Sequence, residues 1–130
     1  MSKTYVLDTH VLIWYFIGSD QLKSRQKEEI EKVRNHSGQL LIPTIVLAEA
    51  LDVAEKGRVE FNFSAMYDLI QKHGSFEITG FSQTIFEKTR QIEKITEIHD
   101  RIIVATASFY ESGVMTKDEV IQDSGEIETL

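Results

Sequence analysis

Four acidic residues from distant parts of the chain could act together as ligands of a divalent cation. They are Asp8, Glu49, Asp100 and Asp118. Carboxylates held close together raise one another's pKa, and divalent cations between them would cancel that repulsion. Ligands that are all oxygen favour hard ions, so the pattern indicates Mg²⁺ or Mn²⁺ rather than zinc. Magnesium held in this way is common where a phosphoryl group reacts.

Each acid also has an ordinary structural alternative. Asp8, together with Thr9, can cap the start of a helix, and Asp100 can stabilise the positive end of another helix dipole. Glu49 can belong to the solvent-facing side of its helix. Asp118 stands in the polar segment TKDEVIQD, where an exposed acid is expected. The hypothesis of a shared site therefore rests on the joint placement of the four acids, and that placement depends on the fold.

Short apolar runs alternate with helical segments along the chain. We expect strands over residues 4–8, 39–43, 76–80, 114–116 and 125–130. We expect helices over residues 9–17, 23–38, 44–57, 63–74, 82–95 and 100–113, with Thr9, Thr44 and Ser82 as N-caps. This alternation favours an α/β fold in which helices cover both faces of a parallel sheet. Binding sites in such sheets form at the carboxyl ends of the strands, where all four acids would then lie.

The length, composition and net charge limit the kind of protein that this chain can be. A length of 130 residues, of which 42% are hydrophobic, fits one domain over 1–130 with its own core. The absence of cysteine excludes thiolate zinc sites and thiol catalysis, and it suits a reducing cytoplasm. The longest apolar run, VLIWYFI, is too short to span a bilayer, so we expect a soluble cytoplasmic protein without membrane contact. A net charge of −7 argues against a broad nucleic-acid-binding face.

Four segments resemble the sequence motifs of the PIN-domain family, of the type found in VapC toxins of bacterial and archaeal toxin–antitoxin pairs. They are YVLDTHVLIW, PTIVLAEALDVAEKGRV, EIHDRIIVATA and VMTKDEVI, and each contains one of the four acids. The resemblance covers nearly the whole chain, and the combination is specific although any one motif would be weak. The chain departs from close relatives at EIHD (97–100), where those relatives tend to read Asp-Pro-Phe-Asp.

The resemblance implies a three-layer α/β/α PIN-like fold with a central parallel sheet of about five strands. It implies an endoribonuclease that uses Mg²⁺ or Mn²⁺, in which a metal-activated water attacks the phosphorus of RNA. The four acids would be the catalytic metal ligands, and the hydroxyls of Thr9 and Thr116 would orient them. It also implies a toxin that forms a homodimer and binds a cognate antitoxin protein.

Three other functions fit an α/β protein with acids at strand ends. A signalling receiver domain requires paired acids after the first strand, but Leu7 precedes Asp8. A phosphatase of the haloacid dehalogenase type requires Asp-x-Asp, but His10 takes the place of the second acid. A PIN-like domain that only binds a partner is expected to lack one or more of the four acids, and all four are present. The metal-dependent ribonuclease is therefore the first choice.

Several polar residues near these motifs have open roles. Glu97 is a longer acid where the family pattern has an aspartate, and Asp123 is more typical of an exposed residue than of a ligand, although it could replace Asp118. Arg101 could contact a phosphate or pair with a neighbouring acid. The basic segment EKGR (55–58) favours a solvated turn over an RNA contact.

Overall fold

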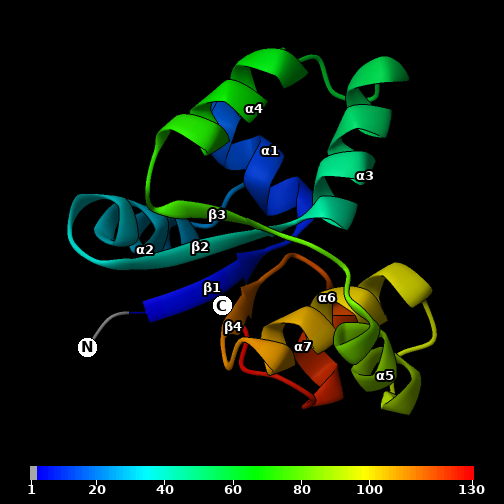
Figure 1. Cartoon of the computed structure of the whole chain (residues 1–130). Coiled ribbons are helices and arrows are strands. Elements are labelled where there is room, and N and C mark those ends of the chain that lie inside the picture. Colours follow the sequence, from blue (N-terminus) through cyan, green and yellow to red (C-terminus); the bar gives the residue numbers. More distant parts are fainter. Residues whose placement is uncertain (1–2) are drawn as a thin grey trace.

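A parallel sheet forms the centre of the molecule. The structure, a computed structural model, describes residues 3–130. Within this range the strands are β1 (Lys3–Leu7), β2 (Gly38–Pro43), β3 (Phe76–Thr79) and β4 (Gly113–Met115), in the order β3–β2–β1–β4 (Figure 1). All pairs are parallel, and Val6 of β1 lies opposite Leu41 on one side and Val114 on the other. The predicted α/β fold class is confirmed.

Helices cover both faces of the sheet. They are α1 (Thr9–Ile17), α2 (Ser24–Asn35), α3 (Thr44–Glu55), α4 (Phe63–Lys72), α5 (Gln83–Gln91), α6 (Ile98–Phe109) and α7 (Glu119–Ser124). Helices α1, α3 and α4 lie together on one side, and α5, α6 and α7 lie together on the other (Figure 1). Helix α2 packs against β2, and α6 packs against β1 and β4.

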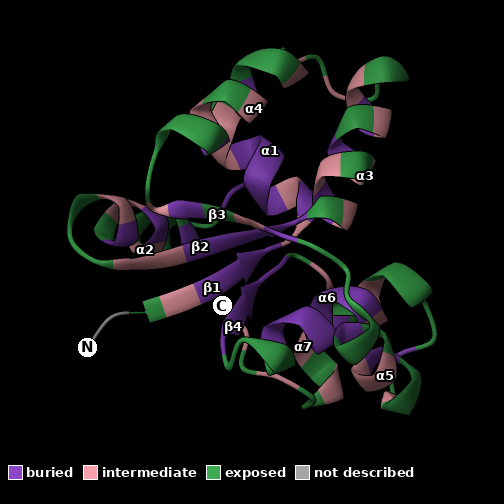
Figure 2. Ribbon diagram, in the orientation of Figure 1, coloured by how far each residue is buried: buried purple, intermediate pink, exposed green. Residues whose placement is uncertain are grey.

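The core follows from the composition of the strands. The ends of β1 and β2 are uninterrupted apolar runs whose residues are buried on both faces, as is typical of parallel sheets (Figure 2). Helix α1 is also largely buried, and it ends at Gly18, which adopts the left-handed conformation with φ of 67°. A residue with a side chain is strained at this φ, so the glycine fixes where the helix stops.

The C-terminal part of the chain differs from the sequence predictions in one strand and one helix. The expected strand over 125–130 contributes only one bridge, between Thr129 and Val114, so the described residues form a four-stranded sheet. Helix α7 follows Asp118 and was not expected from the sequence. The helix has only six residues, and four of them are polar, so it shows little apolar periodicity; its one buried residue is Ile121.

Helix α6 begins at Ile98, two residues before the expected start at 100, because the Glu97 side chain caps it. Two predicted N-caps also differ, each by one residue. The N-cap of α1 is Asp8 rather than Thr9, because the Asp8 carboxylate accepts a hydrogen bond from the Thr9 backbone N–H. The N-cap of α3 is Pro43 rather than Thr44, and no side chain caps this helix. Ser82 caps α5 as predicted. Among residues 3–130, no helix has both the length and the apolar character needed to cross a bilayer.

Candidate active site

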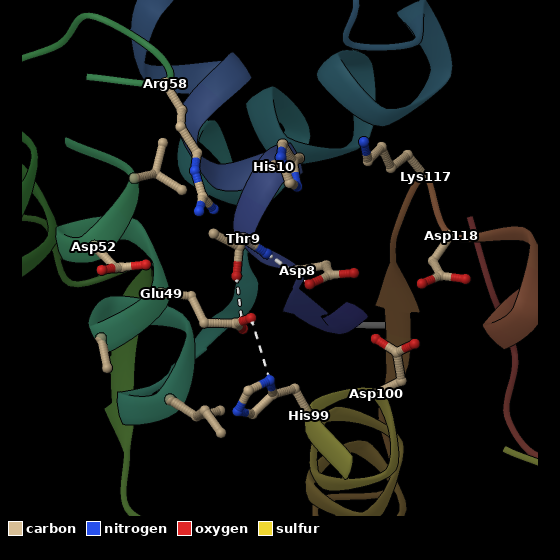
Figure 3. Close-up of a pocket in the computed structure, with 13 residues that line it drawn as sticks. Asp8, Thr9, His10, Glu49, Asp52, Arg58, His99, Asp100, Lys117 and Asp118 are labelled. Carbon is tan, nitrogen blue, oxygen red and sulfur yellow. Dashed lines mark hydrogen bonds and ion pairs between the residues drawn. The ribbon is translucent and has the colours of Figure 1, made fainter. Parts of the chain in front are cut away.

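A pocket of about 560 Å³ opens beside the carboxyl ends of β1 and β4. All four predicted acids line it, together with Thr9. Asp8, Asp100 and Asp118 turn toward one another, and Glu49 faces them from α3 on the other side of the pocket (Figure 3). The fold therefore brings together carboxylates that are up to 110 positions apart in the chain, from Asp8 to Asp118.

Asp8 is held at the centre of the site by two short hydrogen bonds. Its Oδ1 accepts from the backbone N–H of Thr9 at 2.7 Å, and its Oδ2 accepts from the hydroxyl of Thr116 at 2.7 Å. The capping role and the place in the pocket are thus two functions of one side chain. Thr116 is fully buried, so the direction of the Asp8 carboxylate is fixed from inside the protein.

Glu49 approaches from the middle of α3. Its Oε1 accepts a hydrogen bond from the hydroxyl of Thr9 at 3.0 Å, and its Oε2 lies 3.7 Å from Nδ1 of His99. Burial raises the pKa of Glu49, and the hydrogen bond from Thr9 opposes that rise. The carboxylate therefore faces the pocket, not the open solvent side of the helix.

Asp100 lies in the first turn of α6, where Glu97 is the N-cap and accepts a hydrogen bond from the Asp100 backbone N–H at 2.9 Å. The pKa of Asp100 is raised to about 7, first by desolvation and then by a hydrogen bond to Asp118 and the charges of Asp118, Glu97 and Asp8. A carboxyl group shifted in this way holds a proton near neutral pH. Burial and the neighbouring acids therefore both disfavour a fully ionised set of carboxylates at this site.

Asp118 and Thr116 form a short, ordered turn after β4. The Thr116 hydroxyl donates to Asp8 and accepts a hydrogen bond from the Asp118 backbone N–H at 2.9 Å. The Asp118 carboxylate accepts from the backbone N–H of Val120 at 2.8 Å and so caps α7. Thr116 thus fixes two of the four acids at once. The turn is also held by Gln26 of α2, whose amide donates to the Thr116 carbonyl at 3.2 Å.

The donor set fits a divalent cation. Within residues 3–130, no three Asp, Glu, His or Cys side chains are placed as one ready-made metal site. The chemistry is nevertheless that of a hard cation site, because four carboxylates line one pocket and the pKa of Asp100 is raised by burial and then by its acidic neighbours. A cation there would replace the proton that Asp100 otherwise keeps.

Three other polar residues that the sequence left open lie outside the pocket. Glu97 contacts His99 at 3.2 Å and caps α6, but it does not line the pocket, and Asp123 is an exposed residue of α7 outside it. Arg101 of α6 donates to the carbonyl of Thr96 at 2.8 Å, so its guanidinium contacts the loop before its own helix and not the pocket.

The pocket also has basic residues that the sequence reasoning did not assign to it. They are His10, Arg58, His99 and Lys117. Burial lowers the pKa of His10, and the nearby charge of Lys117 lowers it further. In the sequence, His10, His99 and Lys117 are each adjacent to a proposed ligand or to its supporting threonine, and this adjacency could have indicated that they lie at the pocket. The signal at Arg58 was the basic character of EKGR (55–58), which favoured a solvated turn. In the structure this turn is exposed and also brings Arg58 to the pocket.

Comparisons with known proteins agree with this fold. The family model described as PIN domain matches residues 5–126. The chain resembles the structure of VapBC2 from Rickettsia felis bound to a promoter DNA fragment, with 16% identity, a TM-score of 0.74, and coverage of 98% of this chain and 97% of that one. It also resembles a toxin–antitoxin complex from Klebsiella pneumoniae, with 25% identity, a TM-score of 0.60, and coverage of 88% and 86%.

A further similar structure is that of VapC20 from Mycobacterium tuberculosis, a toxin that cleaves the sarcin-ricin loop. Its identity to this chain is 14%, its TM-score is 0.65, and the match covers 95% of this chain and 97% of that one. At this level of identity the likeness concerns the fold. A search of curated proteins finds no match.

Proposed function

The chain belongs to the PIN-domain family, and from this premise we propose that it is a Mg²⁺- or Mn²⁺-dependent endoribonuclease that acts as the toxin of a toxin–antitoxin pair. The observation that carries the proposal is the meeting of Asp8, Glu49, Asp100 and Asp118 in one pocket. Similar structures include toxins of toxin–antitoxin complexes, which supports the same assignment.

The chain's own residues supply ligands and their orientation. Asp8, Glu49, Asp100 and Asp118 would hold the ion, which when bound makes a water nucleophilic near neutral pH and stabilises charge on the phosphate. Thr116 aims the Asp8 carboxylate, and Thr9 aims that of Glu49. Fixed carboxylates need little rearrangement before the reaction, which is the main contribution a protein makes to such a site.

Two partners belong to the same proposal. A cognate antitoxin is proposed because similar structures include a toxin–antitoxin complex from Klebsiella pneumoniae and VapBC2 from Rickettsia felis. A homodimer is proposed alongside it. Large apolar side chains that remain exposed on α5 and α6, among them Phe86 and Phe109, support an association surface.

Removing the metal should abolish the activity. We expect the purified protein to cleave a labelled RNA in Mg²⁺ or Mn²⁺ and to lose that cleavage in chelator, because carboxylates alone can neither lower the pKa of the attacking water nor neutralise charge on the phosphate. Gel analysis of the RNA fragments measures this, and adding excess Mg²⁺ back should restore cleavage. Unchanged cleavage in chelator would refute a metal-dependent reaction.

Replacing Thr116 by Val should weaken both stability and activity. The change removes a buried hydroxyl that donates to Asp8 and accepts from the Asp118 N–H, so we expect a loss of about 1–2 kcal/mol in the free energy of unfolding. Cleavage should fall about 10- to 100-fold, because Asp8 is no longer oriented. Urea denaturation and RNA cleavage measure the two effects.

Thr89→Val is the matched control for this prediction. Thr89 is equally buried, but its hydroxyl donates to the Ile85 carbonyl one turn earlier in the same helix, at 2.8 Å. Cleavage per folded molecule should stay at the wild-type level in this control. An equal loss of cleavage in both variants would show that Thr116 has only a structural role.

A further inference from the structure

We infer that Arg58 and Lys117 bind backbone phosphates of the RNA on either side of the carboxylates. The inference rests on the proposed function and adds the residues that bring the substrate to the site. Both residues line the pocket, one from the turn after α3 and the other from the turn after β4. In Figure 3 they lie on opposite sides of the pocket, with Asp8 and Thr9 between them.

The charge of the site creates the need for such contacts. The chain has a net charge of −7, and the pocket holds a cluster of carboxylates, so the surface as a whole repels a polyanion. Binding of RNA requires cations that meet phosphates locally. Arg58 and Lys117 are the Lys and Arg residues among the described residues that line this pocket.

Both cations are available for a ligand. Arg58 and Lys117 are exposed, and in the described part of the chain neither forms an ion pair with an acid. The neighbouring Lys56, by contrast, pairs with Asp52 at 3.0 Å. Arg101 is likewise engaged, with the Thr96 carbonyl.

The positions of both side chains are set by local structure. Gly57 adopts a left-handed conformation with φ of 66°, and the Arg58 backbone N–H donates to the Val53 carbonyl at 3.2 Å, which closes the turn after α3. Lys117 lies between the hydrogen-bonded residues Thr116 and Asp118, and its Nζ is 5.5 Å from the centroid of the Trp14 ring. The ring face holds the ammonium group near the pocket without removing its charge.

The test measures RNA binding in a protein that does not cleave. Binding of a fluorescent single-stranded oligoribonucleotide to Asp100→Asn in Mg²⁺ is followed by anisotropy over a range of salt concentrations. Adding Arg58→Ala or Lys117→Ala should weaken binding about tenfold at low salt and reduce the slope of log K against log salt by about 0.7 for each lost contact. Arg58→Lys should restore most of the slope, because a phosphate contact needs the charge.

Lys72→Ala and Arg90→Ala are the matched controls. Lys72 ends α4 and Arg90 pairs with Glu87 on α5, and neither lines the pocket. Both should leave the slope unchanged. Circular dichroism checks that every variant is folded. Equal slopes in the parent, the pocket variants and the controls would overturn the inference, as would a parent protein whose RNA binding does not depend on salt.

Separate experiments test the RNA-binding role of the two cations and the proposed nuclease function. Cleavage of the same RNA by the wild-type chain in Mg²⁺ tests the nuclease. Cleavage with unchanged slopes would refute the role of Arg58 and Lys117 alone. Reduced slopes in the two pocket variants without any wild-type cleavage would support their role in binding and refute catalysis.

Discussion

Replacing Asp8 by Asn is expected to lower RNA cleavage about 10²- to 10³-fold while the protein remains folded. The amide oxygen of Asn can still accept the hydrogen bond from the Thr9 N–H, so α1 keeps its cap. What is lost is the negative charge that faces Asp100 and Asp118 and that a divalent cation requires. Cleavage assays in saturating Mg²⁺, with the unfolding transition measured in parallel, test this directly.

Asp8→Ala separates the two roles of the same side chain. It removes both the charge and the cap, so we expect the same loss of cleavage and a further loss of about 1 kcal/mol in the free energy of unfolding. Wild-type cleavage by Asp8→Asn would show that this acid is only a helix cap. If Asp8→Asn does not fold, Asp8→Glu is the variant to measure, because it keeps the negative charge but changes its distance from the other carboxylates.

Replacing Asp100 by Asn is expected to have opposite effects on activity and on metal-free stability. Cleavage should be lost, since the variant lacks one of the proposed ligands. In chelator at pH 8, however, the variant should be more stable than the wild type by about 1 kcal/mol. The gain is modest because the side chain is only half-buried and solvent screens part of the repulsion.

The sign of this effect follows from the direction of the pKa shift. The folded protein raises the pKa of Asp100 from 3.8 to about 7. A raised carboxyl pKa contributes stability that is fully present below the unfolded value and is lost as the pH rises through the folded value. The wild-type chain in chelator should therefore lose stability relative to Asp100→Asn between about pH 4 and pH 7, as followed by urea denaturation across that range.

Magnesium should reverse the order of stability. An ion that binds only the folded protein stabilises it in proportion to its affinity, and the wild-type site should bind more tightly than the Asp100→Asn site. Parallel pH profiles of the two proteins in chelator, or a Mg²⁺ effect of the same size in both, would contradict the proposed electrostatics.

The order of strands and helices could be predicted from the sequence because each element has a clear local pattern. The buried runs that end at Leu7 and at Pro43 are typical of parallel strands, and α1 was predicted with both ends correct apart from its cap. The segment over 125–130 was harder to predict, because the pairing of a short segment at the edge of a sheet depends on its partner strand more than on its own sequence. Its backbone meets Val114 at a single bridge.

The four acids could be predicted to share a site, but not how they are held. Their placement follows from the parallel sheet, which brings the ends of β1 and β4 together. The contact between Thr116 and Asp8 joins residues 108 positions apart, and only packing sets its length of 2.7 Å. Arg58 was expected to lie in a solvated turn, and local sequence gives no sign that this turn folds against the pocket.

The most direct test of the central claim is calorimetric titration of Mn²⁺ into the wild-type chain and into the double variant Asp8→Asn/Asp100→Asn, with Asp123→Asn as the control. If remote carboxylates share the ion, the wild type and the control should bind Mn²⁺ equally and the folded double variant should not bind it. Equal binding by all three proteins would show that the ion lies elsewhere, and the proposed site would be wrong.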